Sequence, residues 1–476
     1  MYGVILAGGS GARFWPVSRE QSPKQLQKFV GSGTMIQNTV QRLQPLIPVE
    51  KLYVGTHHQQ ALETLRQLNS FDFSPDHLLA EPCSRNTAVA IGLMAKMIAD
   101  KDADAVMAVF PADHVVTDSE NFTKVLQKAE ALAQNDFLVT LGIPPTRPET
   151  GFGYLKQGTE INGFEETYHV EQFIEKPDIS TAKKYLELGT YFWNCGVFVW
   201  KATSLLEELQ KHAANIHSQL ETLMSCLQNS KGKLAHLEMN EQGCEIFSSL
   251  PSLSIDYAVM EKSSKVVLVP ANIGWSDVGA WNALDDVCEK DSTGNILTGN
   301  VLARDCNNSI VHGHNRLVAI LGLNDTVVVD TQDALLVCAK DKSQDVKKLV
   351  ESLNEKGRSE GKHHATVKKP WGSYTVLDSG PDFLLKRIEV LPGEALSLQS
   401  HQHRSEHWTV ASGSAKVDRD EETLHLKVNE SVTIPKNAKH RLTNPGSELL
   451  IIFEIQFGNI LDENDIMRYE DRYGRL

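Results

Sequence analysis

The sequence predicts a doubly wound, Rossmann-like α/β domain, followed by a small β module and then an all-β C-terminal domain. The N-terminal part alternates short apolar runs with amphipathic segments, whereas residues 295–339 carry short β-branched runs and frequent turns. After Trp371 the pattern alternates between apolar and polar residues. The 476 residues suffice for about three domains. We predict domains at residues 1–290, 291–354 and 367–476, with a linker at 355–366.

Short apolar runs in the first domain predict four buried strands: Tyr2 to Ala7, Leu52 to Thr56, Ala105 to Phe110 and Phe137 to Ile143. A helix is predicted from Asn121 to Gln134, with Ser119 as its N-cap, because apolar residues recur there at steps of three and four. Alternating strands and helices favour a parallel sheet that binds ligands at the carboxyl ends of its strands. Residues 144–285 are richer in Gly, Pro and aromatic residues and are predicted to form a substrate-facing half.

The β module is predicted from five short runs: Asn300 to Leu302, Ser309 to Val311, Leu317 to Ile320, Thr326 to Val329 and Ala334 to Val337. A helix is predicted after them, from Ser343 to Leu353. The linker is predicted because its polar, glycine-containing stretch has no periodicity. From Trp371 to Gln456 the pattern favours a closed antiparallel barrel or jelly roll.

Composition and charge exclude several functional classes. Hydrophobic residues make up 41% and charged residues 23%, a mixture typical of globular proteins. Lys and Arg number 47 against 61 Asp and Glu, so the formal charge is -14. This charge argues against nucleic-acid or membrane partners and requires any phosphate site to be a local basic pocket. With no long apolar run, no basic leader and seven scattered cysteines, we expect a cytoplasmic protein with reduced thiols.

A glycine-rich loop follows the first predicted strand. Gly8, Gly9 and Gly11 allow backbone amides to approach an anion closely. The loop is neither a dinucleotide fingerprint nor a P-loop, and a purely structural turn is the alternative interpretation. Three cations that follow it are candidates for neutralising the phosphates of a nucleoside triphosphate: Arg13, Arg19 and Lys24.

Two aspartates are candidate ligands of Mg²⁺. Asp113 follows the strand that should end at Phe110, so its carboxylate is expected at the ligand-binding edge of the sheet. A single Asp after a strand is more often a turn or cap residue. Asp277 lies in a glycine-flanked turn from Gly274 to Gly279. The sequence alone does not bring the two aspartates together.

Five motifs in order carry a family resemblance: Gly8 to Arg13 with Pro23 and Lys24, Glu81 to Thr87, Pro111 to His114, Phe173 to Pro177, and Gly274 to Gly279. Together they resemble the mannose-1-phosphate guanylyltransferases of the sugar nucleotidyltransferase superfamily, from Gly3 to about Ala339. The resemblance implies that mannose 1-phosphate attacks the α-phosphorus of GTP, which gives GDP-mannose and pyrophosphate. Relatives that use UTP or dTTP share the glycine loop, so the choice of base stays open.

The same resemblance assigns roles to single residues. It implies that Asp113 and Asp277 hold Mg²⁺ and that Arg13 and Lys24 assist the transfer. The alternatives are a solvated loop charge for Lys176, a turn residue for Asn194 and a helix cap for the segment Arg85 to Thr87. The implied substrate-binding residues are the glycines of the loop (Gly8, Gly9, Gly11) and Gly153, then Lys176 for the sugar phosphate, Glu175 and Asn194 for sugar hydroxyls, and Arg85, Asn86 and Thr87 near guanine and ribose.

A histidine-rich segment marks the last domain. Gln399, His401 and His403 alternate along one predicted strand and so should project from one face, with Glu406 close behind and His440 downstream. Such a set could bind Zn²⁺, Mn²⁺, Fe²⁺ or Co²⁺, and the ligand types do not choose among them.

This segment resembles the cupin family, and more narrowly the type II mannose-6-phosphate isomerase domain, from about residue 360 to 475. Leu398 to Trp408 and Asp465 to Arg475 carry the resemblance. The gap before Glu406 is one residue shorter than the usual cupin pattern, which leaves His407 as a rival ligand. The family implies interconversion of fructose 6-phosphate and mannose 6-phosphate. Arg404 is the candidate for phosphate binding or catalysis, and Lys386 and Arg387 are weaker ones.

Two alternatives remain for the whole chain. The cupin domain could be structural or regulatory, which would leave a single-activity guanylyltransferase, or the protein could be a sugar-nucleotide sensor. If both activities are present, mannose 6-phosphate must become mannose 1-phosphate between them. No phosphoserine mutase motif occurs in the sequence, so a separate phosphomannomutase is implied. The sequence leaves the oligomeric state open, and a homo-oligomer is compatible with it.

Overall fold

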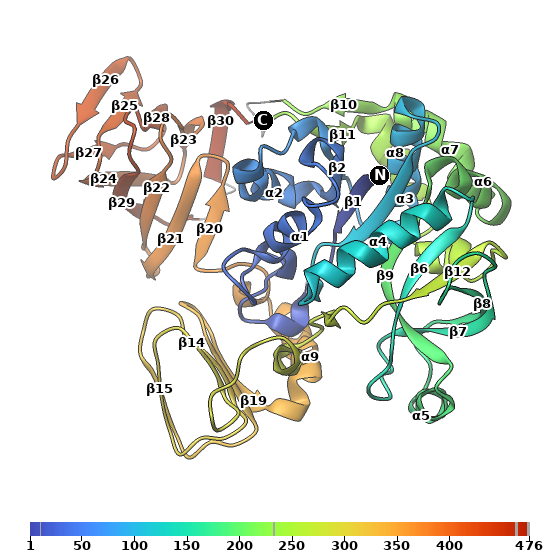
Figure 1. Ribbon diagram of the computed structural model, residues 1–476. Helices are drawn as coiled ribbons and strands as arrows, with labels where there is room; N and C mark the ends of the chain where they lie inside the picture. Colours follow the sequence, from blue (N-terminus) through green and yellow to red (C-terminus); the bar gives the residue numbers. More distant parts are fainter. Residues whose placement is uncertain (10, 232–233, 462–464, 474–476) are drawn as a thin grey trace. The chain divides into compact units, whose positions relative to one another are not determined.

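The computed structural model describes residues 1–9, 11–231, 234–461 and 465–473 (Figure 1). Ser10 of the glycine loop, and Gly474 and Arg475 of the C-terminal motif, lie outside these ranges. The chain forms two compact units. The first comprises Met1–Asn229 and His236–Lys356, and the second comprises Ser230–Ala235 and Gly357–Leu476. This division runs through the predicted linker, and the finer domain boundaries stay a prediction.

An eleven-stranded sheet forms the centre of the first unit, in the order β10-β11-β3-β2-β1-β4-β9-β6-β12-β8-β7. Its buried apolar strands include all four that the sequence predicted, which confirms them to within one residue at each end. Strands β3, β2, β1 and β4 are parallel neighbours, as predicted. The bounds are β1 (Tyr2–Ala7), β2 (Leu52–His57), β3 (Leu78–Glu81), β4 (Val106–Pro111) and β6 (Leu138–Ile143).

Strands from residues 144–285 make the other half of this sheet mixed. Strand β9 (Tyr191–Lys201) runs antiparallel to both of its neighbours, β4 and β6. The remaining strands are β7 (Gly153–Glu160), β8 (Tyr168–Ile174), β10 (Leu227–Asn229), β11 (Leu237–Met239) and β12 (Val266–Pro270). A separate two-stranded pair joins β5 (Val115–Val116) to β13 (Trp275–Ser276).

Helices cover both faces of the sheet. Val109 of β4 belongs to the core cluster of α3 (Asn86–Lys101), whereas the next residue, Phe110, contacts Phe122 of α4 (Ser119–Ala133). Helix α4 begins two residues before the predicted start, and its N-cap is Asp118 rather than Ser119, since the Asp118 carboxylate accepts the Asn121 amide. The other helices are α1 (Met35–Leu43), α2 (Ala61–Leu68), α5 (Ile179–Leu188), α6 (Ala202–His212), α7 (Ala214–Ser225) and α8 (Glu241–Ser249).

The β module belongs to the first unit and is a short parallel solenoid. Strands β14, β16 and β18 stack in parallel, β15 pairs with β17, and β19 returns antiparallel to β18. All five predicted strands are confirmed, and the predicted helix begins at Val346. The bounds are β14 (Ile296–Thr298), β15 (Val301–Arg304), β16 (Ile310–His312), β17 (Val318–Leu321), β18 (Thr326–Asp330), β19 (Leu335–Ala339) and α9 (Val346–Glu355).

A buried ion pair links the segment after the glycine loop to this solenoid. The Arg19 guanidinium lies 3.0 Å from the Asp333 carboxylate, and its side chain is fully buried. The expectation that Arg19 neutralises bound phosphate is therefore wrong. Its charge is instead compensated inside the fold, as a buried arginine requires.

The second unit consists of two antiparallel sheets around one apolar core, which agrees with the predicted barrel or jelly roll. One sheet has the order β20-β21-β22-β29-β24-β27 and the other β26-β25-β28-β23-β30. The bounds are β20 (Thr366–Lys369), β21 (Gly372–Ser379), β22 (Phe383–Val390), β23 (Leu398–His401), β24 (Arg404–Ser412), β25 (Ala415–Arg419), β26 (Glu422–Leu426), β27 (Ser431–Ile434), β28 (His440–Thr443), β29 (Leu450–Gly458) and β30 (Ile466–Glu470).

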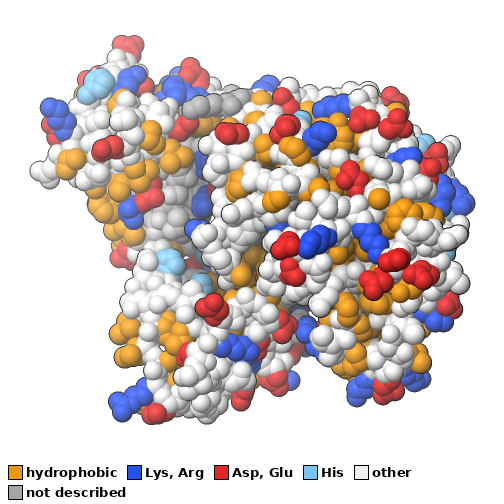
Figure 2. Space-filling model, in the orientation of Figure 1, with side chains coloured by type: hydrophobic (Ala, Val, Ile, Leu, Met, Phe, Trp, Pro, Cys, Tyr) orange, Lys and Arg blue, Asp and Glu red, His pale blue; other side chains and the backbone are white. Residues whose placement is uncertain are grey.

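The surface carries charges of both signs. Figure 2 shows acidic and basic side chains interspersed on the face in view, with apolar patches between them. This mixture accords with the net charge of -14 and differs from the continuous basic surface of a nucleic-acid-binding protein. In the described ranges, the helices are too short or too polar to cross a bilayer.

Candidate functional site

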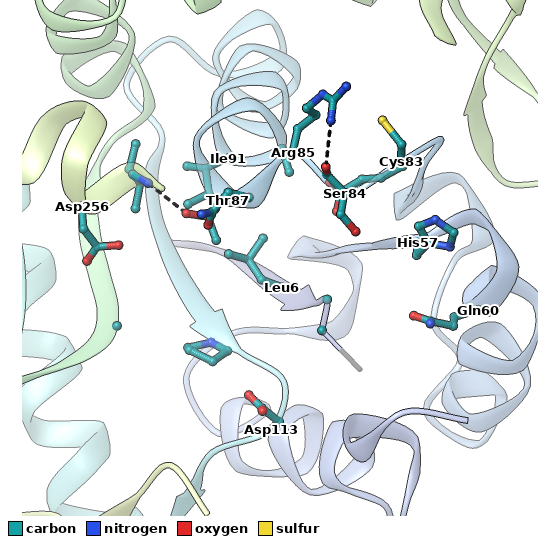
Figure 3. Close-up of a pocket in the computed structure, with 18 of the residues that line it drawn as sticks. Leu6, His57, Gln60, Cys83, Ser84, Arg85, Thr87, Ile91, Asp113 and Asp256 are labelled. Atoms are coloured by element: carbon teal, nitrogen blue, oxygen red, sulfur yellow. Dashed lines mark hydrogen bonds between the residues drawn. The ribbon is translucent and has the colours of Figure 1, made fainter. Parts of the chain in front are cut away.

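A cavity of about 570 Å³ opens at the carboxyl ends of β1, β3 and β4, where the sheet topology predicts ligand binding (Figure 3). Gly8 and Gly9 from the loop after β1 line it, together with Asp113 after β4. The segment Ser84 to Thr87, which leads into α3, forms another part of its wall. The cavity therefore collects three of the five sequence motifs.

Lys24 joins the two aspartates that the sequence could not bring together. Its ammonium lies 3.0 Å from Asp113 Oδ2 and donates a 2.6 Å hydrogen bond to the carbonyl oxygen of Asp277. Only 4% of Lys24 is exposed. Gly11 makes room for it, since a Cβ on Gly11 would lie 2.4 Å from the Cβ of Lys24. The glycine loop and the lysine thus form one packed arrangement.

The charges around Lys24 give the two aspartates different pKa values. Burial alone would raise the pKa of Asp113, but the positive charge of Lys24 holds it below its usual value. Burial raises the pKa of Asp277, and the negative charge of Asp113 adds to this effect. Burial lowers the pKa of His114 to about 4, so it is neutral at pH 7. Two carboxyl groups whose negative charge Lys24 partly compensates suit Mg²⁺, since this ion needs only one or two carboxylate ligands.

The predicted sugar-binding residues also lie together. Lys176 forms a 2.6 Å ion pair with Glu175, and a Cβ on Gly153 would lie 2.5 Å from the Glu175 carboxylate. Asn194 on β9 donates a 2.9 Å hydrogen bond to Asp256. Sequence reasoning missed Asp256, because no strand or helix pattern precedes it. Its burial, reinforced by the negative charge of Glu175, raises its pKa.

The residues predicted to lie near guanine and ribose line the cavity, and each has a different local environment. The Arg85 guanidinium donates to the backbone oxygen of Ser248, and the Thr87 hydroxyl accepts the amide of Ile255 at 2.9 Å. Asn86, the first residue of α3, has a φ of 60°. Arg13 lies apart from these three, as an exposed side chain on a larger adjoining cleft whose wall also includes Lys176 and Asp277.

Glu81, at the end of β3, is a further cavity residue that sequence reasoning quoted only as part of a motif. Its carboxyl group lines the cavity and accepts no hydrogen bond from the residues that the structure describes. Burial raises its pKa to about 7. The burial of this acid gives no sequence signal, because its environment comes from residues far along the chain.

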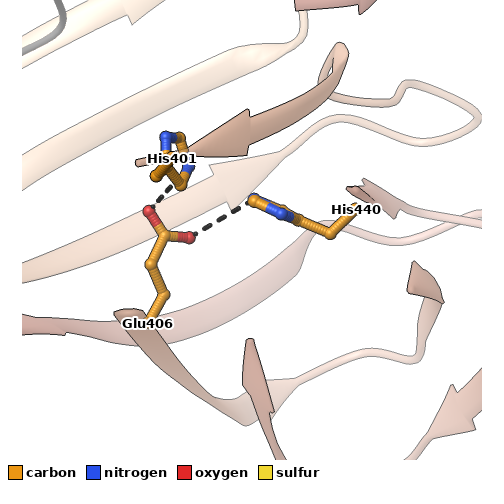
Figure 4. Close-up of side chains that lie close together, drawn as sticks. All are labelled: His401, Glu406 and His440. Carbon is orange, nitrogen blue, oxygen red and sulfur yellow. Dashed lines mark ion pairs between the residues drawn. The ribbon is translucent and has the colours of Figure 1, made fainter. Parts of the chain in front are cut away.

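In the second unit, His401, Glu406 and His440 converge from three strands (Figure 4). Their ligand atoms lie within 4.8 Å of one another, and all three side chains are buried. Glu406 Oε1 lies 3.0 Å from His401 Nε2, and Oε2 lies 3.6 Å from His440 Nε2. Two imidazoles and a carboxylate fit a divalent transition metal. Glu406, and not its rival His407, therefore faces the cluster.

Electrostatics keep the Glu406 carboxylate ionised. Burial opposes its charge, but the hydrogen bond and positive charge of His401, with the charge of His440, hold its pKa below the usual range. Arg404 donates a 3.1 Å hydrogen bond from Nε to Glu406 Oε1. Arg404 therefore orients the carboxylate of the cluster, and its role in phosphate binding or catalysis stays a prediction.

His403 does not share a face with His401, contrary to prediction. Strand β23 ends at His401, so the alternation stops there, and the chain bends before β24. The His403 side chain is 39% exposed and lies 2.7 Å from the Asp465 carboxylate. Gln399 lines a narrow cavity beside Glu406 and accepts a hydrogen bond from Ser397, so its metal role stays a prediction.

Family comparisons agree with this division of the chain. Residues 2–294 match the Nucleotidyl transferase family, which covers more than half of the chain. The chain belongs to the nucleotidyl transferase family. Residues 299–353 match the MannoseP isomerase/GMP-like beta-helix domain, and residues 356–471 match the Mannose-6-phosphate isomerase C-terminal family. This nucleotidyl transferase thus carries a second enzyme family's domain, as the motifs predicted.

Curated relatives of this nucleotidyl transferase match along its whole length. It is 43% identical to the alginate biosynthesis protein AlgA of Pseudomonas syringae pv. tomato, over 100% of this chain and 97% of AlgA. It is 42% identical to the mannose-1-phosphate guanylyltransferase RfbM of Salmonella typhimurium, over 99% of this chain and 97% of RfbM.

A solved structure shares the architecture of the first unit. The Thermus thermophilus protein described as a mannose-1-phosphate geranyltransferase aligns with a TM-score of 0.66 and 34% identity. The alignment covers 74% of this chain and 99% of that one. That structure therefore shares the fold of most of this nucleotidyl transferase.

Replacing Glu81 with Gln should change the pH dependence of stability. The unfolded chain releases this proton near the ordinary pKa of 4.5 and the folded chain near about 7, so wild type loses stability as pH rises between these values. The variant lacks this loss. The difference in free energy of unfolding between variant and wild type should therefore favour the variant by on the order of 2 kcal/mol more at about pH 8 than at about pH 5. Urea unfolding measures the gain, with the exposed Glu20→Gln of the same cavity as control. An equal effect at both pH values would contradict the raised pKa.

Proposed function

We propose that the first unit transfers GMP from GTP to mannose 1-phosphate, giving GDP-mannose and pyrophosphate. One observation carries the proposal, namely the contact of Lys24 with both aspartate segments beside a nucleotide-sized cavity. Full-length relatives with this named activity support the choice of substrates.

The reaction needs positioning and charge neutralisation rather than a nucleophilic side chain. An oxygen of mannose 1-phosphate attacks the α-phosphorus of GTP, and pyrophosphate leaves from the opposite side. Lys24 and Arg13 neutralise phosphate charge, while the amides around Gly8, Gly9 and Gly11 approach the phosphate oxygens. Asp113 and Asp277 would hold Mg²⁺, which supplies further neutralisation of the phosphate oxygens when bound.

In this proposal, the two substrates bind to different groups of residues in the site. Lys176 meets the phosphate of mannose 1-phosphate, with Gly153 leaving space beside it, and Glu175 and Asn194 bond its hydroxyls. The wall formed by Arg85, Asn86 and Thr87 lies against guanine and ribose. The Lys176 ammonium now pairs with Glu175, so binding of the sugar phosphate exchanges one anionic partner for another.

We further propose that the second unit interconverts fructose 6-phosphate and mannose 6-phosphate. The cluster of His401, Glu406 and His440 and the family match of residues 356–471 support this function. These three side chains would hold Zn²⁺, Mn²⁺ or Co²⁺, which supplies stabilisation of charge on the sugar oxygens when bound. A proton must move between two neighbouring carbons, and Arg404 keeps Glu406 oriented beside them.

The two reactions do not connect directly. The second unit would make mannose 6-phosphate, but the first uses mannose 1-phosphate, so a separate phosphomannomutase must act between them. The sequence contributes no motif for that step. A single-activity guanylyltransferase with a structural or regulatory cupin domain is the remaining alternative, and turnover of fructose 6-phosphate distinguishes the two.

Asp113→Asn should reduce release of pyrophosphate from GTP and mannose 1-phosphate by about two to three orders of magnitude, because it removes an ionised metal ligand without changing size. A coupled pyrophosphate assay with GTP, ATP, UTP and dTTP measures the rate and the choice of base. Asp305→Asn, on a side chain that is 78% exposed, is the matched control. Near wild-type release by a folded Asp113→Asn protein would refute the metal assignment, and equal use of UTP by wild type would refute the guanylyl assignment.

His401→Ala should abolish conversion of fructose 6-phosphate to mannose 6-phosphate by the metal-supplemented chain, since it removes one of three clustered ligands. Guanylyl transfer by the same preparation should stay at the wild-type rate and reports on folding. His425→Ala, on an exposed position of β26, controls for loss of any barrel histidine. Turnover by neither wild type nor variant would establish the single-activity alternative.

A further inference from the structure

Two reduced cysteines from distant parts of the chain come to the same end of the central sheet, beside the cavity of about 570 Å³. Cys83 is the second residue after β3 and belongs to the cavity wall. Cys244 lies in α8, and both side chains are partly buried. Because the two residues are far apart along the chain, their spacing gives no sign of a pair.

Helix α8 brings the two cysteines close to each other through Ser248. The Cys83 Sγ lies 3.4 Å from the Ser248 hydroxyl oxygen. Ser248 follows Cys244 by four residues, so both side chains lie on one face of the helix, with their Cβ atoms about 5–6 Å apart. Side chains of a helix lean toward its N-terminus, so the Ser248 hydroxyl and the Cys83 thiol lie over the turn that carries Cys244.

The register of the central sheet indicates the same proximity independently. Strand β11 runs parallel to β3, with Glu238 beside Ala80. The next residues along the two strands are Met239 and Glu81, and the Cys244 thiol donates a 3.6 Å hydrogen bond to the Met239 carbonyl oxygen. Cys244 therefore lies where β11 ends, about one strand spacing of 4.8 Å from the end of β3, which the other cysteine follows.

The two thiols differ in their readiness to react. Burial raises the pKa of Cys244, and the nearby negative charges of Glu238 and Cys83 add to this effect. Only the thiolate form attacks a disulfide, so Cys244 is a poor first nucleophile. Cys83 is reached from the cavity that it lines and is therefore the thiol that reacts first. Figure 3 shows its sulfur directed away from Asp113.

We propose that Cys83 and Cys244 form a reversible disulfide that weakens nucleotide binding. A small-molecule disulfide is the oxidant. The Cys83 thiolate attacks one of its sulfur atoms and expels a thiolate, which leaves a mixed disulfide on Cys83. The Cys244 thiolate then attacks the Cys83 sulfur and expels the second thiolate. The two protein thiols are oxidised and lose their protons, while the small disulfide is reduced and takes up the protons as two thiols.

The disulfide acts on the cavity through the segment that contains Cys83. The Arg85 guanidinium donates to the backbone oxygen of Ser248, so this segment contacts α8 at one residue through two side chains. An S–S bond is only about 2.0 Å long, so the Cys83 sulfur must leave Ser248 and move toward Cys244. This movement displaces Arg85 and the wall beside it. The effect on GTP rests on the proposed function, whereas formation of the disulfide does not.

The first measurement treats the full-length chain with oxidised glutathione and maps disulfides by mass spectrometry without reduction. Wild type should give two peptides joined through Cys83 and Cys244 and should lose two of its seven free thiols. Cys244→Ser lacks the second thiol and should stop at a glutathione adduct on Cys83. Cys338→Ser, at a partly buried position of β19, is the matched control and should form the disulfide as wild type does.

Calorimetric titration with GTP measures the effect on the cavity. The Kd of oxidised wild type should be at least about fivefold above that of the reduced protein, a loss comparable to one hydrogen bond, and dithiothreitol should reverse it. Reduced Cys244→Ser should bind GTP as reduced wild type does.

The two measurements separate the possible failures. A glutathione adduct that persists on wild type, or seven thiols that remain free, would overturn the disulfide. An unchanged Kd after the disulfide has formed would overturn its effect on nucleotide binding. If reduced wild type binds no GTP, the guanylyl proposal fails, and the peptide map still decides whether Cys83 and Cys244 pair.

Discussion

The position of the Lys24 ammonium is the constraint on which the first site depends. A single buried charge joins segments that are 89 and 253 residues away in the sequence, at the end of β4 and in the turn that contains Asp277. Because an isolated buried charge is unstable, these segments must be in place for the lysine to be buried at all. The absence of a side chain at Gly11 provides the space. In this region, folding and the gathering of these charged groups are therefore the same event.

In the second unit, different groups also stabilise a buried charge. Glu406 is stabilised as an anion by His401 and His440, and Arg404 fixes its orientation from one side. The first site places charges of both signs around Lys24, which suits the proposed transfer between phosphate groups.

The sequence predicted those features that depend on local pattern. Strands β1, β2, β4 and β6 follow from buried apolar runs, and the location of Asp113 follows from the end of β4. Features that depend on distant contacts were missed or wrong. Arg19 pairs with Asp333, 314 residues away. His403 failed for a local reason, because the strand ends two residues before it.

The most direct test of the account is the rate of pyrophosphate release by Lys24→Met at saturating GTP and mannose 1-phosphate. Methionine fills the space of the lysine stem but removes the charge that both aspartate segments share. The account predicts a folded protein, judged by its thermal transition, whose rate is at least about a hundredfold below wild type. A folded Lys24→Met protein that releases pyrophosphate at close to the wild-type rate would contradict the central role of this ammonium group.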